Sequence, residues 1–253
     1  MNQQDEKCAH GHFFGLGDRH WEASAFGDSK PEFVPGLTLC ERFSRDVIEP
    51  LLRERFPGLQ FASARIDYGS DVLGFDTELS RDHAWGPQTT IFLAPRDHEA
   101  LQHKIDRVLQ EGIPAQFMGY PTRSTDEPIW RALPGTQGRH RVRIETVDSF
   151  FEWLLGFVPS REISVAEWLC LPAQKLCVVS AGKIFADDVG ELTDWQRRFS
   201  WYPPDVWRHI MSCQWQKLAQ REPFAGRCAH VGDEWGSIDN AHHACLLYTS
   251  PSP

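Results

Sequence analysis

The sequence predicts an α/β core followed by a mainly helical C-terminal part. Residues 62–68 alternate apolar and polar side chains, as a half-buried strand requires, and residues 89–93 form a β-branched, apolar run that favours a second strand. Apolar residues at helical spacing before and after these strands complete the α/β pattern. At 253 residues, the chain is long enough for one sizeable core and a second, smaller one.

Two helices and a loop are predicted around these strands. Apolar residues recur at helical spacing over residues 37–56, and Pro50 is expected to kink or split that helix. A second amphipathic helix is predicted over residues 97–111, with Gly112 directly after it. Glycine, proline and threonine dominate residues 117–138, which predicts an irregular loop.

A third strand and a helical region follow. Residues 139–146 alternate, which predicts a strand with Arg141, Arg143 and Glu145 on one face. Helices are expected at residues 147–157, 164–171, 193–199, 204–221 and from about 226, and two short strands at 175–187 around Ala181 and Gly182. Pro223 is expected to end the helix before it. Six of the ten tryptophans follow Glu167; such a series is usually core, with a stacking platform as the alternative.

The stretch most typical of a functional site is residues 62–93, ASARIDYGSDVLGFDTELSRDHAWGPQTTIFL. The first strand leads into Gly69 and Ser70, where a residue without Cβ lets the backbone turn sharply and approach a ligand. Asp82 lies at the mouth of the second strand. The N–H groups and hydroxyl of the turn would meet phosphate oxygens, and the carboxylate would meet a hard cation such as Mg²⁺.

The order Gly69-Ser70, Gly74, Ser80 and Asp82 resembles the signature of the nucleotidyltransferase superfamily. The strings GSDVLGFDTELSRDHAWGP, SAGKIFADDVGELT and WYPPDVWRHIMSCQWQKLAQREPFAGRC resemble one uncharacterised bacterial branch of it, a domain of unknown function. The resemblance covers roughly residues 33–244 and extends to aminoglycoside-nucleotidyltransferase-like enzymes. It implies a nucleotidyltransferase-like mixed sheet with flanking helices, covered by a truncated, mainly helical C-terminal domain.

The resemblance also implies an activity. A nucleoside monophosphate, AMP from ATP, would be transferred to a hydroxyl group of a small molecule or protein. Gly69 and Ser70 would seat the β- and γ-phosphates, and Arg141 and Arg143 would neutralise phosphate charge. An exposed, salt-bridged strand face is the alternative for the two arginines.

Mg²⁺ would be the cofactor, held by Asp82 and by Glu145, the residue that matches the third carboxylate of the superfamily best. The second carboxylate would lie two residues after Asp82, where this chain has Ala84. Residues two apart on a strand point to the same side, so that pair would hold one ion together. Ala84 therefore favours the alternative of a relative that binds a nucleotide or partner without turnover. Asp71 or Asp76 could replace the missing carboxylate, or cap turns in the loop.

Composition limits the partners and the compartment. The formal net charge of −9 argues against nucleic acid as the main partner, so a nucleotide and an acceptor molecule are expected. No apolar run approaches the length of a membrane span, and the N-terminus lacks the apolar centre of a signal peptide. Seven cysteines without a C-x-x-C pair indicate reduced thiols. We therefore expect a cytoplasmic protein.

Four segments are predicted along the chain. Residues 1–31 are polar and glycine-punctuated, which favours a flexible extension. Residues 32–158 would form the nucleotidyltransferase-like domain and residues 159–244 the truncated helical domain, with the division near Pro159. Residues 245–253 read CLLYTSPSP, which resembles a translated sequencing adapter. We expect these nine residues to be a read-through artefact. The natural chain would then continue beyond residue 244 with helices that this sequence lacks.

Overall fold

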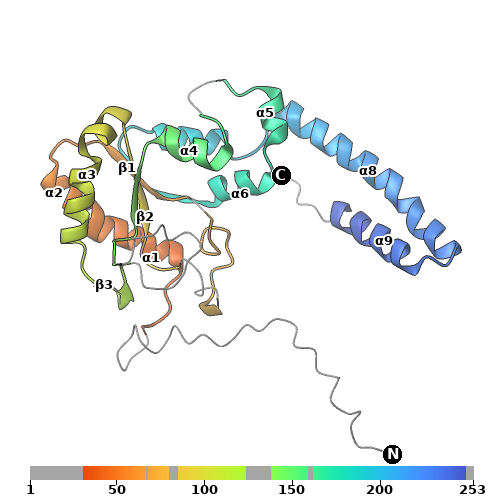
Figure 1. The fold of residues 1–253 in the computed structure, drawn as a ribbon, viewed down its shortest axis with the longest axis horizontal. Helices are drawn as coiled ribbons and strands as arrows, with labels where there is room; N and C mark the ends of the chain where they lie inside the picture. Colours follow the sequence, from red (N-terminus) through yellow and green to blue (C-terminus); the bar gives the residue numbers. More distant parts are fainter. Residues whose placement is uncertain (1–30, 67, 80–84, 124–137, 159–161, 249–253) are drawn as a thin grey trace, which may run out of the picture.

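A four-stranded mixed sheet forms the centre of the molecule (Figure 1). The structure is a computed structural model that describes residues 31–66, 68–79, 85–123, 138–158 and 162–248. The strands are β1 (Phe61–Arg65), β2 (Thr89–Leu93), β5 (Val142–Glu145) and β6 (Lys183–Asp187), in the order β5-β2-β1-β6. β1 is antiparallel to both neighbours, and β5 is parallel to β2. Helices pack against the sheet, so the predicted α/β fold is confirmed.

Parts of several predicted segments lie outside the described residues. They include residues 1–30 of the extension, 80–84 with Asp82 and Ala84, 124–137 of the loop, 159–161 at the predicted division, and 249–253.

The N-terminal helices cover one face of the sheet. They are α1 (Gly36–Phe43), the π-helical turn η1 (Ser44–Ile48), α2 (Glu49–Arg55) and α3 (Pro95–Gly112). The predicted interruption before Pro50 is confirmed, because η1 ends where α2 begins. Proline has no N–H to donate, and the wider π turn accommodates the missing hydrogen bond. Ile48, Leu52, Ile105 and Leu109 pack against strand residues such as Ile91 in one buried cluster.

β1 is buried on both faces, so the expectation of a half-buried strand is wrong. Ala62 and Ala64 lie in the core shared with the later helices, as alternation predicts. Ser63 on the other face is fully buried because the N-terminal helices cover it. Its hydroxyl donates to Glu49 at 3.2 Å and accepts from the Ser44 hydroxyl at 3.0 Å. These hydrogen bonds satisfy polar groups that burial would otherwise destabilise.

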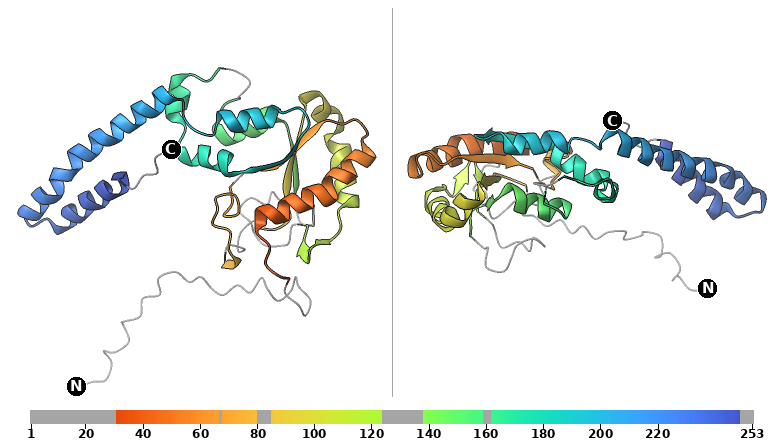
Figure 2. Two further views of the ribbon diagram at one scale, coloured as in Figure 1. Left: turned by 180° about the vertical axis from the view of Figure 1, so that it is seen from behind. Right: turned by 90° about the horizontal axis from the view of Figure 1, so that it is seen from above.

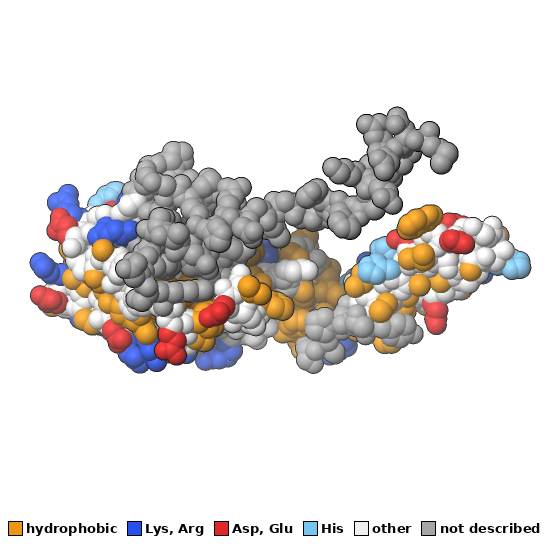
Figure 3. All heavy atoms as spheres, turned by 90° about the horizontal axis from the view of Figure 1, so that it is seen from below, with side chains coloured by type: hydrophobic (Ala, Val, Ile, Leu, Met, Phe, Trp, Pro, Cys, Tyr) orange, Lys and Arg blue, Asp and Glu red, His pale blue; other side chains and the backbone are white. Residues whose placement is uncertain are grey.

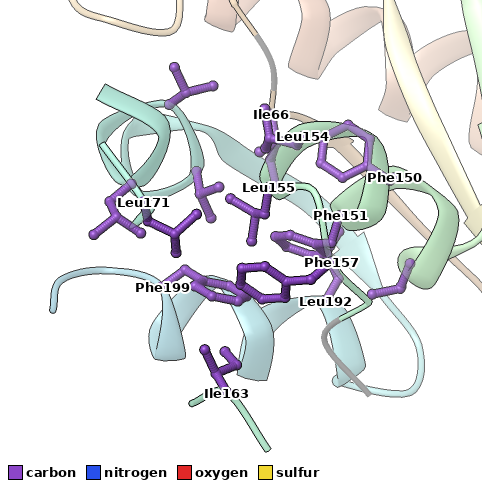
Figure 4. Packing of buried hydrophobic residues seen from close by; sticks show 14 of the residues in the cluster. Ile66, Phe150, Phe151, Leu154, Leu155, Phe157, Ile163, Leu171, Leu192 and Phe199 are labelled. Atoms are coloured by element: carbon purple, nitrogen blue, oxygen red, sulfur yellow. The ribbon is translucent and has the colours of Figure 1, made fainter. Parts of the chain in front are cut away.

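The later helices build a second core against the sheet. They are α4 (Val147–Leu155), α5 (Val165–Cys170), α6 (Ala173–Ala181) and α7 (Glu191–Arg198). Figure 4 shows Phe151, Phe157 and Phe199 at the centre of this core, and the ring centroids of Phe151 and Phe199 are 5.3 Å apart. Four of the six later tryptophans belong to it or pack against it, as expected of a core series: Trp168, Trp195, Trp201 and Trp207. Trp215 and Trp235 are exposed.

The prediction of two short strands at 175–187 is wrong. The first part is helix α6, which buries Leu176 and Val179, and the second part is strand β6. Gly182 lies at the junction because a Cβ there would approach the Arg65 carbonyl oxygen to 2.9 Å. The glycine therefore allows close approach to β1 rather than a hairpin turn. Through β6 the sheet continues past the division predicted near Pro159.

The last two helices form an antiparallel arm that projects from the body (Figure 2). They are α8 (Pro204–His230) and α9 (Glu234–Tyr248). Pro223 lies inside α8 and does not end it, contrary to expectation. α9 packs along α8 on both sides of the proline: Arg221 and Asp239 lie 3.8 Å apart before it, and Cys228 and Asn240 are in contact after it. α9 begins eight residues later than predicted, at Glu234, and continues through Cys245 to Tyr248.

The arm exposes much of its apolar surface. Figure 3 shows hydrophobic and histidine side chains on its outer part, which stands apart from the body. Trp235 is 83% exposed, and Val231 and Ile238 are also exposed. None of the described helices is long and apolar enough to span a bilayer.

The predicted loop at 117–138 contains a small hairpin in its described part. β3 (Gln116–Phe117) pairs with β4 (Tyr120–Pro121), and Met118 and Gly119 both have positive φ. Two residues of this conformation form the tight turn that suits the twist of antiparallel strands.

Candidate functional site

The Gly69–Ser70 turn follows the carboxyl end of β1. The Gly69 carbonyl accepts from the Leu73 N–H at 3.1 Å, and the Ser70 carbonyl accepts from the Phe75 N–H at 2.9 Å. The chain therefore closes on itself directly after the turn. A Cβ at residue 69 would lie 2.1 Å from Asp71 Oδ1 and 2.6 Å from Arg65 Nη2. Glycine is required at 69 because Arg65 and Asp71 occupy the space that a Cβ would take. This requirement does not depend on a bound ligand.

A buried ion pair supports the turn. Arg65, the last residue of β1, donates from Nε to Asp71 Oδ2 at 2.9 Å and from Nη2 to Asp71 Oδ1 at 3.1 Å. The two side chains are only 7% and 3% exposed. Arg65 Nη2 also donates to the Tyr68 carbonyl at 3.3 Å, so one guanidinium holds both sides of the turn. Such a two-point pair fixes geometry as well as charge.

Arg141 and Cys40 extend this buried cluster. Arg141 Nη1 donates to the Trp85 carbonyl at 2.7 Å, and the Cys40 thiol donates to the Gly86 carbonyl at 3.3 Å. Burial raises the pKa of Cys40 to about 11, so the thiol is neutral at pH 7. Burial also lowers the pKa of Arg141 to about 10, which still leaves the guanidinium charged.

Two guanidinium groups meet in this cluster. Arg65 and Arg141 both interact electrostatically with Asp71, and the Asp76 carboxylate lies beside them on Trp85 Nε1. Guanidinium groups in a sparsely hydrated position bind anions such as phosphate.

Asp76 connects its loop to helix α1 and to Trp85. One carboxylate oxygen accepts from the Gly36 N–H, at the first turn of α1, and the other accepts from Trp85 Nε1 at 3.1 Å. The carboxylate thereby caps α1 from a distant loop and holds the indole of Trp85 in place.

Glu145 lies at the other end of β5 from this cluster. Val142 pairs with Thr89 at the start of β2, and Glu145 pairs with Phe92 three residues on, a distance of about 10 Å along the strand. Glu145 Oε1 accepts from Arg143 Nη2, and Oε2 accepts from the Ser149 hydroxyl, both at 3.0 Å. Ser149 also belongs to the capping box of α4, which follows the strand directly.

The predicted site residues are thus partly brought together. Gly69, Ser70 and Arg141 lie at one end of the sheet. Arg143 pairs with Thr90 further along, and Glu145 lies beyond it. Asp82 lies outside the described residues, in the segment that leads into Trp85.

The described carboxylates do not by themselves fit a magnesium site. Asp71 has both oxygens on Arg65, Asp76 has both on donors of Gly36 and Trp85, and Glu145 has both on donors of its own strand and α4. Mg²⁺ needs oxygen ligands in near-octahedral geometry. No group of three metal-ligating side chains occurs in the part of the chain that the structure describes.

Sequence reasoning missed Arg65, Tyr68 and Trp153 as site residues. Tyr68 precedes the turn, and its ring contacts Trp153 of α4 with centroids 6.2 Å apart. A signal for Trp153 was present, because the buried α4 positions Phe150, Phe151 and Leu154 place residue 153 off the buried face. No comparable signal in the sequence marks Arg65, because the path of the turn brings its partner Asp71 to it.

Part of the chain matches a known domain family. Residues 168–247 match a family model described as Domain of unknown function (DUF4037). No curated protein matches the chain.

The comparison with solved structures also gives a match. It is the crystal structure of a nucleotidyltransferase-like protein from Exiguobacterium sibiricum 255-15, with 14% sequence identity and a TM-score of 0.31. The match covers 84% of this chain and 59% of that one, so this chain spans somewhat more than half the length of its solved neighbour. Residues 168–247 are therefore similar to a domain family of unknown function.

Proposed function

We propose that this chain binds the triphosphate of a nucleotide, with ATP as the expected ligand, beside the Gly69–Ser70 turn. The observation that supports this proposal is the buried cluster beneath the turn, which brings the guanidinium groups of Arg65 and Arg141 together around Asp71. The two guanidinium groups would attract phosphate oxygens, and the N–H groups of a tight turn would bind them. The net charge of the whole chain is −9, so this attraction is local.

The reaction that the family resemblance implies is AMP transfer, and the composition favours the cytoplasm as its place. A hydroxyl oxygen of a small molecule or protein would attack the α-phosphorus of ATP, forming a phosphate ester while pyrophosphate and the hydroxyl proton leave. Mg²⁺ held at Asp82 and Glu145 would neutralise charge on the phosphates. For Glu145 to serve in this way, the carboxylate would have to release Arg143 or Ser149.

Nucleotide binding without turnover is the second candidate, and specific observations favour it. Ala84 stands where the superfamily pattern has a second carboxylate. Asp71 and Asp76, which could have replaced it, are committed to Arg65 and to the α1 terminus. Phosphate binding at the turn does not need the carboxylate that Ala84 replaces.

Both candidates are tested by titrating ATP with and without Mg²⁺ and measuring pyrophosphate release. Arg141→Met should weaken ATP binding with and without Mg²⁺, because the guanidinium charge is lost. Arg208→Met is the matched control, since Arg208 is 73% exposed on α8. Unchanged ATP binding by Arg141→Met would contradict the phosphate site.

Ala84→Asp and Asp82→Ala separate turnover from binding. If the missing carboxylate limits catalysis, Ala84→Asp should add Mg²⁺-dependent binding and pyrophosphate release to a wild type that shows little of either. Wild type could instead release pyrophosphate fast, with the release abolished in Asp82→Ala and unchanged in Ala84→Asp. That result would establish AMP transfer and show that another residue completes the metal site.

A further inference from the structure

Two aromatic rings meet beside the Gly69–Ser70 turn. Tyr68 directly precedes the turn, and Trp153 lies near the carboxyl end of α4. Their rings are nearly perpendicular, at 82°, with centroids 6.2 Å apart. α4 follows β5 and runs back along the sheet, which brings Trp153 from the Glu145 end to the end that carries the turn.

Trp153 is not part of the core that α4 builds. The buried face of this helix consists of Val147, Phe150, Phe151, Leu154 and Leu155, and Figure 4 shows the last four within the buried cluster. Trp153 is 48% exposed and Tyr68 is 37% exposed. Two large aromatic rings exposed together beside a candidate ligand site are typical of a surface that stacks a planar ring.

Arg143 adds a cation to these rings. Its guanidinium carbon lies 4.9 Å from the Trp153 ring centroid, and its side chain is 38% exposed. The ion pair with Glu145, at 3.0 Å, holds the guanidinium in this position. Arginine planes and aromatic rings both stack on nucleobases, and arginine also binds phosphate.

We propose that Tyr68 and Trp153, with Arg143 packed on the Trp153 ring, form a platform that binds the base of the bound nucleotide, stacked on one ring and edge-on to the other. This inference rests on the proposed phosphate site, because it places the base next to the turn that would hold the phosphates. Tyr68 and Gly69 are adjacent in the chain, so one nucleotide spans both. In this arrangement Arg143 stays paired with Glu145 and supports the Trp153 ring.

The platform determines ligand preference through ring size. Stacking depends on the area of the planar ring and not on particular hydrogen bonds. ATP and GTP should therefore bind with similar affinity, and both should bind more tightly than UTP. Inorganic tripolyphosphate, which has no base, should bind most weakly.

The test compares ATP with tripolyphosphate in wild type and in Trp153→Ala, by calorimetry in one buffer. Wild type should prefer ATP by about tenfold, and Trp153→Ala should lose this preference while its affinity for tripolyphosphate stays unchanged. Trp153→Phe should retain most of the preference. Trp235→Ala is the matched control, because Trp235 is 83% exposed on α9, in the arm. Tyr68→Ala provides a second variant, at an exposed loop position, if Trp153→Ala unfolds.

The outcomes separate the two proposals. If wild type binds tripolyphosphate and ATP equally, or if Trp153→Ala and Tyr68→Ala keep the preference for ATP, the platform is refuted and the phosphate site stands. If wild type binds neither ligand, the phosphate site fails and the platform fails with it. A loss of preference in Trp153→Ala that Trp235→Ala does not share would establish the platform.

Discussion

Arg65 and Asp71 form a buried, two-point ion pair that closes the Gly69–Ser70 turn, with N–O distances of 2.9 and 3.1 Å. The pair explains why residue 69 has no side chain, since a Cβ would collide with both partners. It also removes Asp71 from the set of available metal ligands. One interaction therefore sets both the shape of the turn and the charge beneath it.

Gly69→Ala is expected to destabilise the protein by about 1–3 kcal/mol, because the new methyl group forces the ion pair apart. Urea denaturation measures the change. Gly226→Ala is the control: residue 226 lies inside α8 with open space around it, so alanine should stabilise the helix by about 1 kcal/mol. Equal stability of Gly69→Ala and wild type would show that the turn has room for a side chain.

Asp71→Leu is expected to cost about 3–5 kcal/mol, because it leaves the guanidinium of Arg65 buried without its carboxylate. The double variant Arg65→Met, Asp71→Leu should recover part of this loss, since it removes the unpaired charge. Asp205→Leu is the control, because its pair with Arg208 is exposed and should leave the urea midpoint unchanged. A double variant less stable than Asp71→Leu alone would contradict this account.

The sequence predicted most of the local structure because local patterns determine it. The strand at 89–93 is observed as β2 with the same limits, and the helix predicted at 97–111 is α3, Pro95–Gly112. Apolar periodicity and a proline near a helix start suffice for such elements. The aromatic series likewise predicted the position of the second core, in which Trp168 is buried.

Long-range pairing could not be predicted in the same way. β6 joins β1 from more than 100 residues away, and Gly182 reads as a turn signal although its function is close packing. The position of Glu145 depends on strand register, which alternation alone does not fix. Whether Asp71 contacts a metal ion or Arg65 depends on the path of a short turn. The sequence is compatible with either contact, because it does not determine that path.

Cys40 is expected to make stability depend on pH between 9 and 11. Burial raises its pKa from 9.0 to about 11, so in this range the unfolded chain loses the thiol proton while the folded chain keeps it. Stability from this group is complete below pH 9 and decreases as pH rises through 11, by up to roughly 3 kcal/mol. Denaturation of wild type and Cys40→Ala from pH 8 to 11 measures the effect.

In this series the free energy of unfolding should fall more steeply with pH for wild type than for Cys40→Ala. Cys170→Ala, at an exposed thiol, should follow the wild-type slope. Parallel curves for wild type and Cys40→Ala would show that the thiol is not held neutral by the fold.

Truncation should show where the folded unit ends. A fragment of residues 1–212 keeps all four strands of the central sheet. It also retains Trp207 and Ile210, which pack against the second core. It lacks only the outer arm, so it should unfold cooperatively at nearly the same temperature as the whole chain. A fragment of residues 1–158 lacks β6 and the core residues Leu176 and Phe199, and should not fold. Circular dichroism melting and amide dispersion in NMR spectra measure both. Cooperative unfolding of residues 1–158 would show that the sheet is stable without β6 and that the division near Pro159 separates two domains.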